Sequence, residues 1–260
     1  VIVTDHKKAP QQGKNVAVKG DLGQSAAGKT DKNGELTVPE VEQTERHGVY
    51  IVGYTDGTFG PSRSMTRSEA AAIFARLLAE KNGDTISTAA NTKFADIPAH
   101  AWYSGYVKYL SNNGITYGKS KTIFAPNDAI TRAEFTTMAV RFFDVYGDGD
   151  AEIMEQFSGF NDVSSGYWAA EYIKYAALHG WINGYGDGSF HADREINRAE
   201  VVTIVNRLLG READEDYIAD NLRKLNTFPD VTKRHWAYYA VMEAANAHTA
   251  VLGESESWSK

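Results

Sequence analysis

The segment GYGDGSF at residues 184–190, followed by NRAE at residues 197–200, decides the fold because it recurs along the chain. Its counterparts are GYTDGTF and TRSE at residues 53–59 and 66–69, and GKSKTIF and TRAE at residues 118–124 and 131–134. The arginines of the three copies are spaced by 65 and 66 residues. Repetition at a nearly fixed period indicates several copies of one supersecondary unit.

A second segment type alternates with the first and combines a phenylalanine, an aspartate two residues later and a tryptophan six residues after the aspartate. It occurs three times: at Phe94, Asp96 and Trp102, at Phe160, Asp162 and Trp168, and at Phe228, Asp230 and Trp236. The series begins with the first type and ends with the second, so residues 226–260 form a half-repeat. We expect this half-repeat to complete the third unit and to close a compact pseudo-threefold set, because an open solenoid would need polar capping repeats.

Apolar residues follow each repeated arginine at offsets 3, 6, 7, 10 and 11, which is helical spacing. An N-cap residue precedes each arginine, and a glutamate three positions after the cap completes a capping box. The pairs are Thr66 and Glu69, Thr131 and Glu134, and Asn197 and Glu200. Each tryptophan is expected to open a second helix, and Asp-Gly pairs predict tight turns between the helices. The predicted fold class is mainly α, a pseudo-threefold bundle of three helix-loop-helix motifs with a small β-rich N-terminal segment.

The N-terminal residues differ from the repeats, with short predicted strands at 1–5, 16–18 and 30–39 separated by polar turns. They are similar to part of a β-sandwich. The predicted boundaries are 1–44 for this segment, 45–93, 94–156 and 157–225 for the three motifs, and 226–260 for the closing half-repeat.

Composition excludes several classes of protein. With 42% hydrophobic and 23% charged residues, the chain of 260 residues is a folded globular protein. No run approaches the about 20 apolar residues of a membrane span, so membrane insertion is not expected. The absence of cysteine excludes disulfides and thiol catalysis. A net charge of −7 disfavours nucleic acid as a partner, and an anionic ligand would need local basic sites.

The recurring Phe-x-Asp-Val, tryptophan-headed helix, glycine loop and Thr-Arg-Ala-Glu resemble the S-layer homology domain family over about residues 45–252. This resemblance implies three helical motifs in a pseudo-trimer, an extracellular location at the cell surface, and non-covalent anchoring. The implied partner is secondary cell-wall polysaccharide or another peptidoglycan-linked glycan, often with pyruvate-ketal sugars. The N-terminal segment similarly resembles the end of a bacterial immunoglobulin-like or carboxypeptidase-regulatory-like module.

The repeated arginines are the first candidate ligand-binding residues. A cation at a helix N-terminus is disfavoured by about 0.3–1 kcal/mol, so its recurrence requires a reason. A guanidinium beside free backbone N–H groups is a good carboxylate receptor. The alternative is an ion pair with the aspartate of the next half-unit. The three repeated arginines are Arg67, Arg132 and Arg198. Changing all three to alanine is expected to abolish cell-wall binding with helix content unchanged.

The tryptophans have two interpretations, because an indole ring can stack on a sugar or fill the core. Together with the family pattern, the residues predict three sites: Arg67, Asp96 and Trp102; Arg132, Asp162 and Trp168; and Arg198, Asp230 and Trp236. Three glycines, Gly53, Gly118 and Gly184, would allow a ligand to approach the backbone, although turn geometry also explains a glycine. The middle copy departs most, since KSKT at residues 119–122 brings two lysines that could favour a negative polymer.

The remaining residue patterns give no metal site and no catalytic site. The acidic residues Asp144, Asp148, Asp150 and Glu152 do not have the spacing of an EF-hand loop, so no metal site and no cofactor are predicted. The sequence has no His-Glu-x-x-His pair, nucleophile elbow or phosphate-binding loop, so no catalytic residue is assigned. Three classes of function remain: a carbohydrate-binding anchor, a structural interaction module of a surface layer without glycan binding, and a cell-wall hydrolase. The anchor, which is not an enzyme, is preferred.

Overall fold

The computed structural model describes residues 15–19, 25–29, 43–146, 157–252 and 256–259. The chain divides into two units, Val1–Gln43 and Thr44–Lys260. In the first unit, β1 (Asn15–Lys19) pairs antiparallel with β2 (Ser25–Lys29). The strand expected at 16–18 lies within β1, whereas β2 was not predicted. The strands expected at 1–5 and 30–39, and the acidic residues Asp148, Asp150 and Glu152, lie outside the described residues.

The second unit is mainly helical, as predicted. Its elements in chain order are β3 (Gln43–His47), α1 (Arg67–Asn82), α2 (Ser104–Asn112), α3 (Arg132–Tyr146), α4 (Ala170–Leu178), α5 (Arg198–Leu209), α6 (Glu215–Asn221), the 3-10 turn η1 (Leu222–Lys224), α7 (Tyr238–Ala245), β4 (His248–Leu252) and β5 (Ser257–Ser259). The strand order of the small sheet is β3-β4-β5. We call α1, α3 and α5 the arginine helices, α2, α4 and α7 the tryptophan helices, and residues 53–59, 118–124 and 184–190 the glycine loops.

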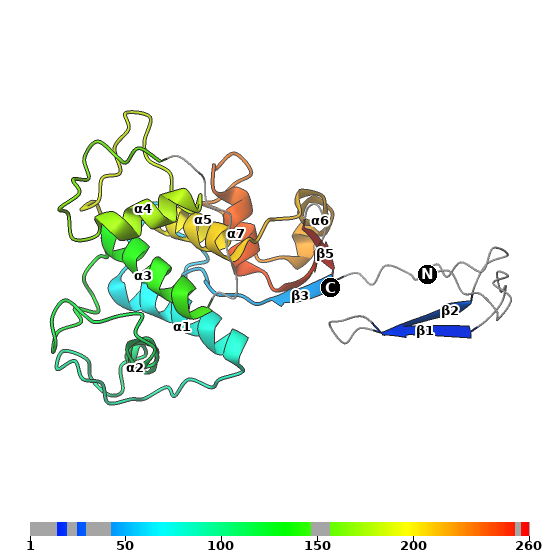
Figure 1. Cartoon of the computed structure of the whole chain (residues 1–260), viewed down its shortest axis with the longest axis horizontal. Coiled ribbons are helices and arrows are strands. Elements are labelled where there is room, and N and C mark those ends of the chain that lie inside the picture. Colours follow the sequence, from blue (N-terminus) through cyan, green and yellow to red (C-terminus); the bar gives the residue numbers. More distant parts are fainter. Residues whose placement is uncertain (1–14, 20–24, 30–42, 147–156, 253–255, 260) are drawn as a thin grey trace, which may run out of the picture. The chain divides into compact units, whose positions relative to one another are not determined.

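The capping boxes start the arginine helices where the sequence predicts. In α1, Thr66 Oγ1 accepts a hydrogen bond from the Glu69 N–H at 3.2 Å, and Glu69 Oε2 accepts one from the Thr66 N–H at 2.8 Å. The boxes at α3 and α5 are the same. The three helices lie together in Figure 1, and rings of Phe74 and Phe135 contact each other at 5.3 Å between centroids.

A closed ring of backbone hydrogen bonds creates the pseudo-threefold arrangement. The N–H of Met65 donates to Ile196 O at 2.9 Å, that of Ile196 to Ile130 O at 3.0 Å, and that of Ile130 to Met65 O at 2.9 Å. All three side chains are fully buried. Because each copy binds both others through the same residue, the arrangement is cyclic and not an open solenoid.

The tryptophan helices α2, α4 and α7 begin two residues after the tryptophans and contact α1, α3 and α5 respectively. The aspartate of each Phe-Asp-Trp segment holds a glycine loop. Asp96 accepts the N–H groups of Phe124 and Ala125, Asp162 those of Phe190 and His191, and Asp230 those of Phe59 and Gly60. The C-terminal half-repeat therefore packs α7 on the third arginine helix and joins Asp230 to the glycine loop of the first copy.

Replacing Asp230 by alanine is expected to lower the melting temperature by roughly 2 to 8 °C at pH 7, since two charge-assisted hydrogen bonds are lost at a partly exposed site. Burial raises the pKa of Asp230, but the N–H groups of Phe59 and Gly60 outweigh it and hold the pKa below its ordinary value. The carboxylate's contribution is therefore present at neutral pH and is lost as the pH falls through its folded pKa. Thermal melts at pH 7 and pH 3 should show the difference from the parent chain shrinking in acid.

The matched control is Asp220→Ala, which removes an exposed carboxylate from α6. This variant should melt like the parent chain. Equal melting temperatures for the Asp230 variant and the parent chain at pH 7 would show that the first glycine loop does not need this closure.

Candidate functional site

Three equivalent pockets lie where the copies meet. Each combines a glycine loop and an arginine helix of one copy, the repeated arginine of a second helix, and an exposed tryptophan. The first pocket is lined by Gly53, Tyr54, Glu69, Arg76, Trp102 and Arg198. The second is lined by Tyr117, Gly118, Glu134, Arg141, Trp168 and Arg67, and the third by Gly184, Tyr185, Glu200, Arg207, Trp236 and Arg132. Their volumes are about 210, 90 and 280 Å³.

The pockets group the expected residues differently from their order along the chain. Arg67, for example, shares a pocket with Gly118 and Trp168, and Trp102 shares one with Arg198. Asp96, Asp162 and Asp230 line none of the three pockets, because their carboxylates accept the loop N–H groups. The expected site residues thus separate into residues that line the pockets and aspartates that hold the glycine loops.

The repeated arginines are buried and hold the copies together. Arg67 donates from Nε to Phe124 O at 2.7 Å and pairs with Glu134 at 3.0 Å, and 5% of its side chain is exposed. Arg132 and Arg198 make the equivalent bonds to Phe190 O and Phe59 O. The alternative to anion binding was an ion pair with an aspartate; the arginines do form ion pairs, but the partner is the capping-box glutamate of the next arginine helix. Burial lowers the pKa of Arg132 and of Arg198.

The N–H groups at the starts of the arginine helices are not free, contrary to expectation. In α1 the N–H groups of Arg67 and Ser68 donate to Asp128 O and Pro126 O of the next copy, both at 3.0 Å. The starts of α3 and α5 are bound by backbone carbonyls of neighbouring copies in the same way. These donors therefore serve the contact between copies and are not available to an anion.

A second arginine in each pocket was missed in the sequence. Arg76, Arg141 and Arg207 each follow the repeated arginine by nine residues, and this recurrence is the signal that could have revealed them. Arg76 and Arg141 are half-buried and Arg207 is exposed. With two guanidiniums and one carboxylate, each pocket is a local basic site on a chain with a net charge of −7.

The three repeated tryptophans do not fill the core. Trp102, Trp168 and Trp236 are 54%, 57% and 65% exposed, whereas Trp181 and Trp258 are buried. A large apolar ring held at a pocket rim with more than half of its surface in water is available to a ligand.

The geometry that the three glycine loops share explains why each loop begins with a glycine. A Cβ atom on Gly184 would lie 2.5 Å from the Phe160 ring and 2.7 Å from Ser189 O. Gly53 and Gly118 face Phe228 and Phe94 with the same restriction. These glycines line the pockets, but the packing of the loop on a phenylalanine requires them whether or not a ligand binds.

Of the two lysines in the glycine loop of the middle copy, Lys119 forms an ion pair with Asp128 at 3.1 Å.

Among the residues that the structure describes, no helix has the length and apolarity to span a bilayer.

The fold and pockets define a protein made of three cyclically joined helical repeats, each presenting an arginine and tryptophan pocket. The family model of the S-layer homology domain matches residues 37–71, 93–136 and 159–202, so the chain carries three S-layer homology domains. The first match lacks a Phe-Asp-Trp segment, and the C-terminal half-repeat at Phe228, Asp230 and Trp236 stands in that place in the structure.

Several curated proteins are similar. Cell surface glycoprotein 1 of Acetivibrio thermocellus is 34% identical over 81% of this chain, and the cellulosome-anchoring protein of the same organism is 30% identical over 89%. The surface-layer 125 kDa protein of Lysinibacillus sphaericus is 32% identical over 61%. The matched regions cover only 9%, 49% and 13% of these relatives, respectively.

Proposed function

We propose that this chain anchors a surface protein non-covalently to the bacterial cell wall by binding secondary cell-wall polysaccharide at the three pockets. The observation that carries the proposal is the repeated pairing of an exposed tryptophan with two arginines on an otherwise acidic chain. The names of the relatives, among them a cellulosome-anchoring protein and a surface-layer protein, support a location at the cell surface.

The chemistry of the pockets favours an acidic sugar such as a pyruvate ketal. An indole face stacks on the apolar face of a sugar ring, and a guanidinium binds a carboxylate through a planar pair of donors. The more exposed second arginines are the better placed for this role, because the repeated arginines are already committed to carbonyls and glutamates. Three modest sites on one rigid body give avidity if the polymer spans them.

Two other functions make different predictions. A structural module of a surface layer would not bind sacculi at all. A hydrolase would need two carboxylates about 5–10 Å apart at the scissile bond. The described lining of each pocket contains a single acid, Glu69, Glu134 or Glu200, and each of these is engaged in its capping box and an ion pair. The pockets therefore favour binding over hydrolysis.

A pull-down with purified sacculi tests the proposal. We expect the protein to sediment with native sacculi and to be lost from sacculi whose pyruvate has been removed chemically. No retention on native sacculi would favour the structural module, and release of reducing sugar would favour the hydrolase. Equal retention on both preparations would place recognition in the neutral part of the glycan.

A further inference from the structure

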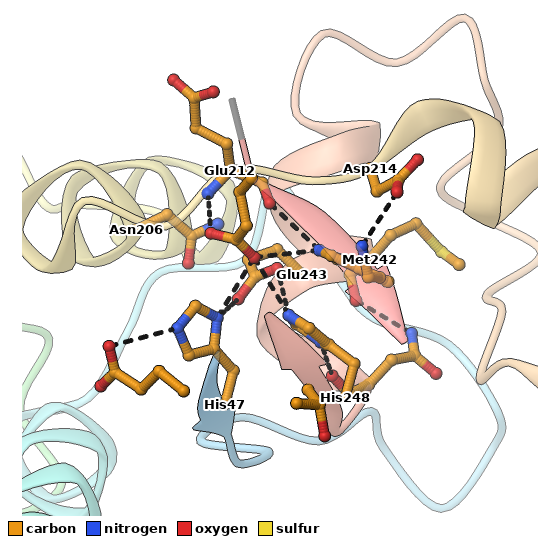
Figure 2. A network of polar contacts seen from close by, with 12 residues as sticks. His47, Asn206, Glu212, Asp214, Met242, Glu243 and His248 are labelled. Carbon is orange, nitrogen blue, oxygen red and sulfur yellow. Dashed lines mark hydrogen bonds and ion pairs between the residues drawn. The ribbon is translucent and has the colours of Figure 1, made fainter. Parts of the chain in front are cut away.

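A cluster of four titratable side chains lies outside the three pockets, where the start and the end of the repeat region meet. It contains His47 at the end of β3, Glu243 on α7, His248 at the start of β4, and Glu256 just before β5. One potential ligand atom from each residue lies within 4.8 Å of all the others. In Figure 2 the side chains of His47, Glu243 and His248 point toward one another.

The distances between these atoms match the edges of a small coordination tetrahedron. His47 Nδ1 lies 3.3 Å from oxygens of both Glu243 and Glu256, and His248 Nε2 lies 3.3 and 3.2 Å from oxygens of the same two residues. A tetrahedral zinc site with bonds of about 2.0–2.1 Å has edges of about 3.3–3.4 Å. His47 faces Oε1 of Glu243 and His248 faces Oε2, so a tetrahedron with one oxygen from Glu243 and Oε1 of Glu256 contains three of these distances. Three edges therefore already have the length that a central ion of this size requires.

The interior of the cluster has unmet polar groups. Both carboxylate oxygens of Glu243 and Nδ1 of His47 are buried and make no hydrogen bond of good geometry, and the Glu243 side chain is 0% exposed. A buried carboxylate without hydrogen bonds of good geometry is costly, even with two imidazoles about it. A divalent cation bound to one oxygen of Glu243 and to Nδ1 of His47 would compensate the charge of the carboxylate and give the nitrogen a partner.

The surroundings of the cluster orient His248 and Glu256 as metal ligands. His248 Nδ1 lies 3.0 Å from Asn246 O, which can only accept, so Nδ1 carries a proton. Nε2 faces Glu243 and Glu256 and can bind a metal ion in the neutral imidazole. The other nitrogen of His47, Nε2, lies 3.9 Å from the exposed carboxylate of Glu45, a distance too long for a hydrogen bond. Glu256 is positioned by the indole N–H of Trp258 at 3.0 Å and by the Glu212 N–H at 2.9 Å.

The competing interpretation is a buried ion-pair network without a metal. Burial lowers the pKa of His47, but the carboxylates of Glu243 and Glu256 outweigh it and raise the pKa to about 9, while the nearby Arg211 acts to lower it. A protonated His47 would compensate part of the negative charge. It would still leave Glu243 without good hydrogen bonds, which is why the geometry decides between the two.

We propose that His47, Glu243, His248 and Glu256 bind a divalent transition-metal ion of the zinc class. Two imidazoles and two carboxylates suit Zn²⁺, whereas Mg²⁺ and Ca²⁺ prefer six or more oxygens. The ion would join β3 to α7, β4 and the segment before β5, and so fasten the entry of the repeat ring to its exit. This role is structural and does not depend on glycan binding.

The test uses the full 260-residue chain after treatment with a chelator. Calorimetric titration with Zn²⁺ should show one ion per chain, and Co²⁺ should give the intense visible absorption of a tetrahedral complex. Zn²⁺ at about a hundredfold excess over its dissociation constant should raise the melting temperature by roughly 5 to 10 °C. Mg²⁺ and Ca²⁺ at the same concentration should not.

Glu243→Gln keeps the shape of the side chain and removes a charged ligand, so it should weaken Zn²⁺ binding at least about 100-fold. Glu171→Gln, which changes an exposed glutamate on α4, is the matched control and should bind Zn²⁺ like the parent chain. Absence of Zn²⁺ binding to the parent chain, or equal affinity in the Glu243 variant, would overturn the proposal and leave an ion-pair network. If Glu243→Gln does not fold, the Co²⁺ spectrum of the parent chain decides alone. The absence of the intense visible absorption would then overturn the proposal.

Discussion

A variant in which Trp102, Trp168 and Trp236 are all alanine is expected to lose retention on native sacculi by about 10² to 10⁴-fold. Each indole is more than half exposed at the rim of a pocket, so its removal takes away contact with the ligand and little of the core. A rigid aromatic anchor contributes about 1–2 kcal/mol, and about 1.4 kcal/mol corresponds to tenfold in affinity. The melting temperature should stay within about 2 °C of the parent chain.

The matched control replaces three exposed apolar residues outside the pockets, Val49, Val145 and Leu222, by alanine. These side chains are 38%, 44% and 42% exposed, so the control removes exposed apolar groups without changing a pocket, and it should remain bound. Single tryptophan variants should give a graded loss, smallest for Trp168, because the second pocket has the smallest volume. Full retention of the triple tryptophan variant would show that the glycan site lies elsewhere on the ring.

Local features of the fold were predictable from sequence because they depend on neighbours in the chain. The capping boxes at Thr66, Thr131 and Asn197 fixed the helix starts, and each arginine helix begins at the residue after its cap. The tryptophan helices begin slightly later than expected, two residues after the tryptophan. Helix α6 and the strands β4 and β5 have no counterparts in the other copies, so the periodicity contained no signal for them.

The composition of the pockets could not be predicted, because it depends on which copies become neighbours in space. The repeat shows that Arg67, Arg132 and Arg198 are equivalent, but it does not show that each enters the pocket of a different copy. It also hides the double role of Glu134, whose Oε2 caps α3 while its Oε1 pairs with Arg67. The second arginines were visible as a recurrence, but a polar residue on a helix has no distinctive local signature.

The burial of the repeated arginines changes what their replacement should do. The sequence predicts that alanine at these positions removes binding and leaves the fold intact. In the structure, Arg67 fills a buried position between two copies, where Nε binds Phe124 O and the guanidinium pairs with Glu134. Its removal leaves a carbonyl and a carboxylate without their partner at the contact that keeps the ring closed.

Arg67→Ala is therefore expected to lower the free energy of unfolding by about 2 to 4 kcal/mol, which corresponds to a melting temperature roughly 4 to 16 °C lower. Arg67→Lys keeps the charge but cannot serve both partners through one planar fork, so it should recover only part of the loss. Arg207→Ala removes an exposed arginine from the third pocket and should weaken sacculus binding with little change in stability. Thermal melts and sacculus retention, measured well below each melting temperature, separate the two roles. An Arg67→Ala variant that melts like the parent chain but no longer binds sacculi would make Arg67 a ligand contact, and the closure of the ring would then rest on the backbone hydrogen bonds alone.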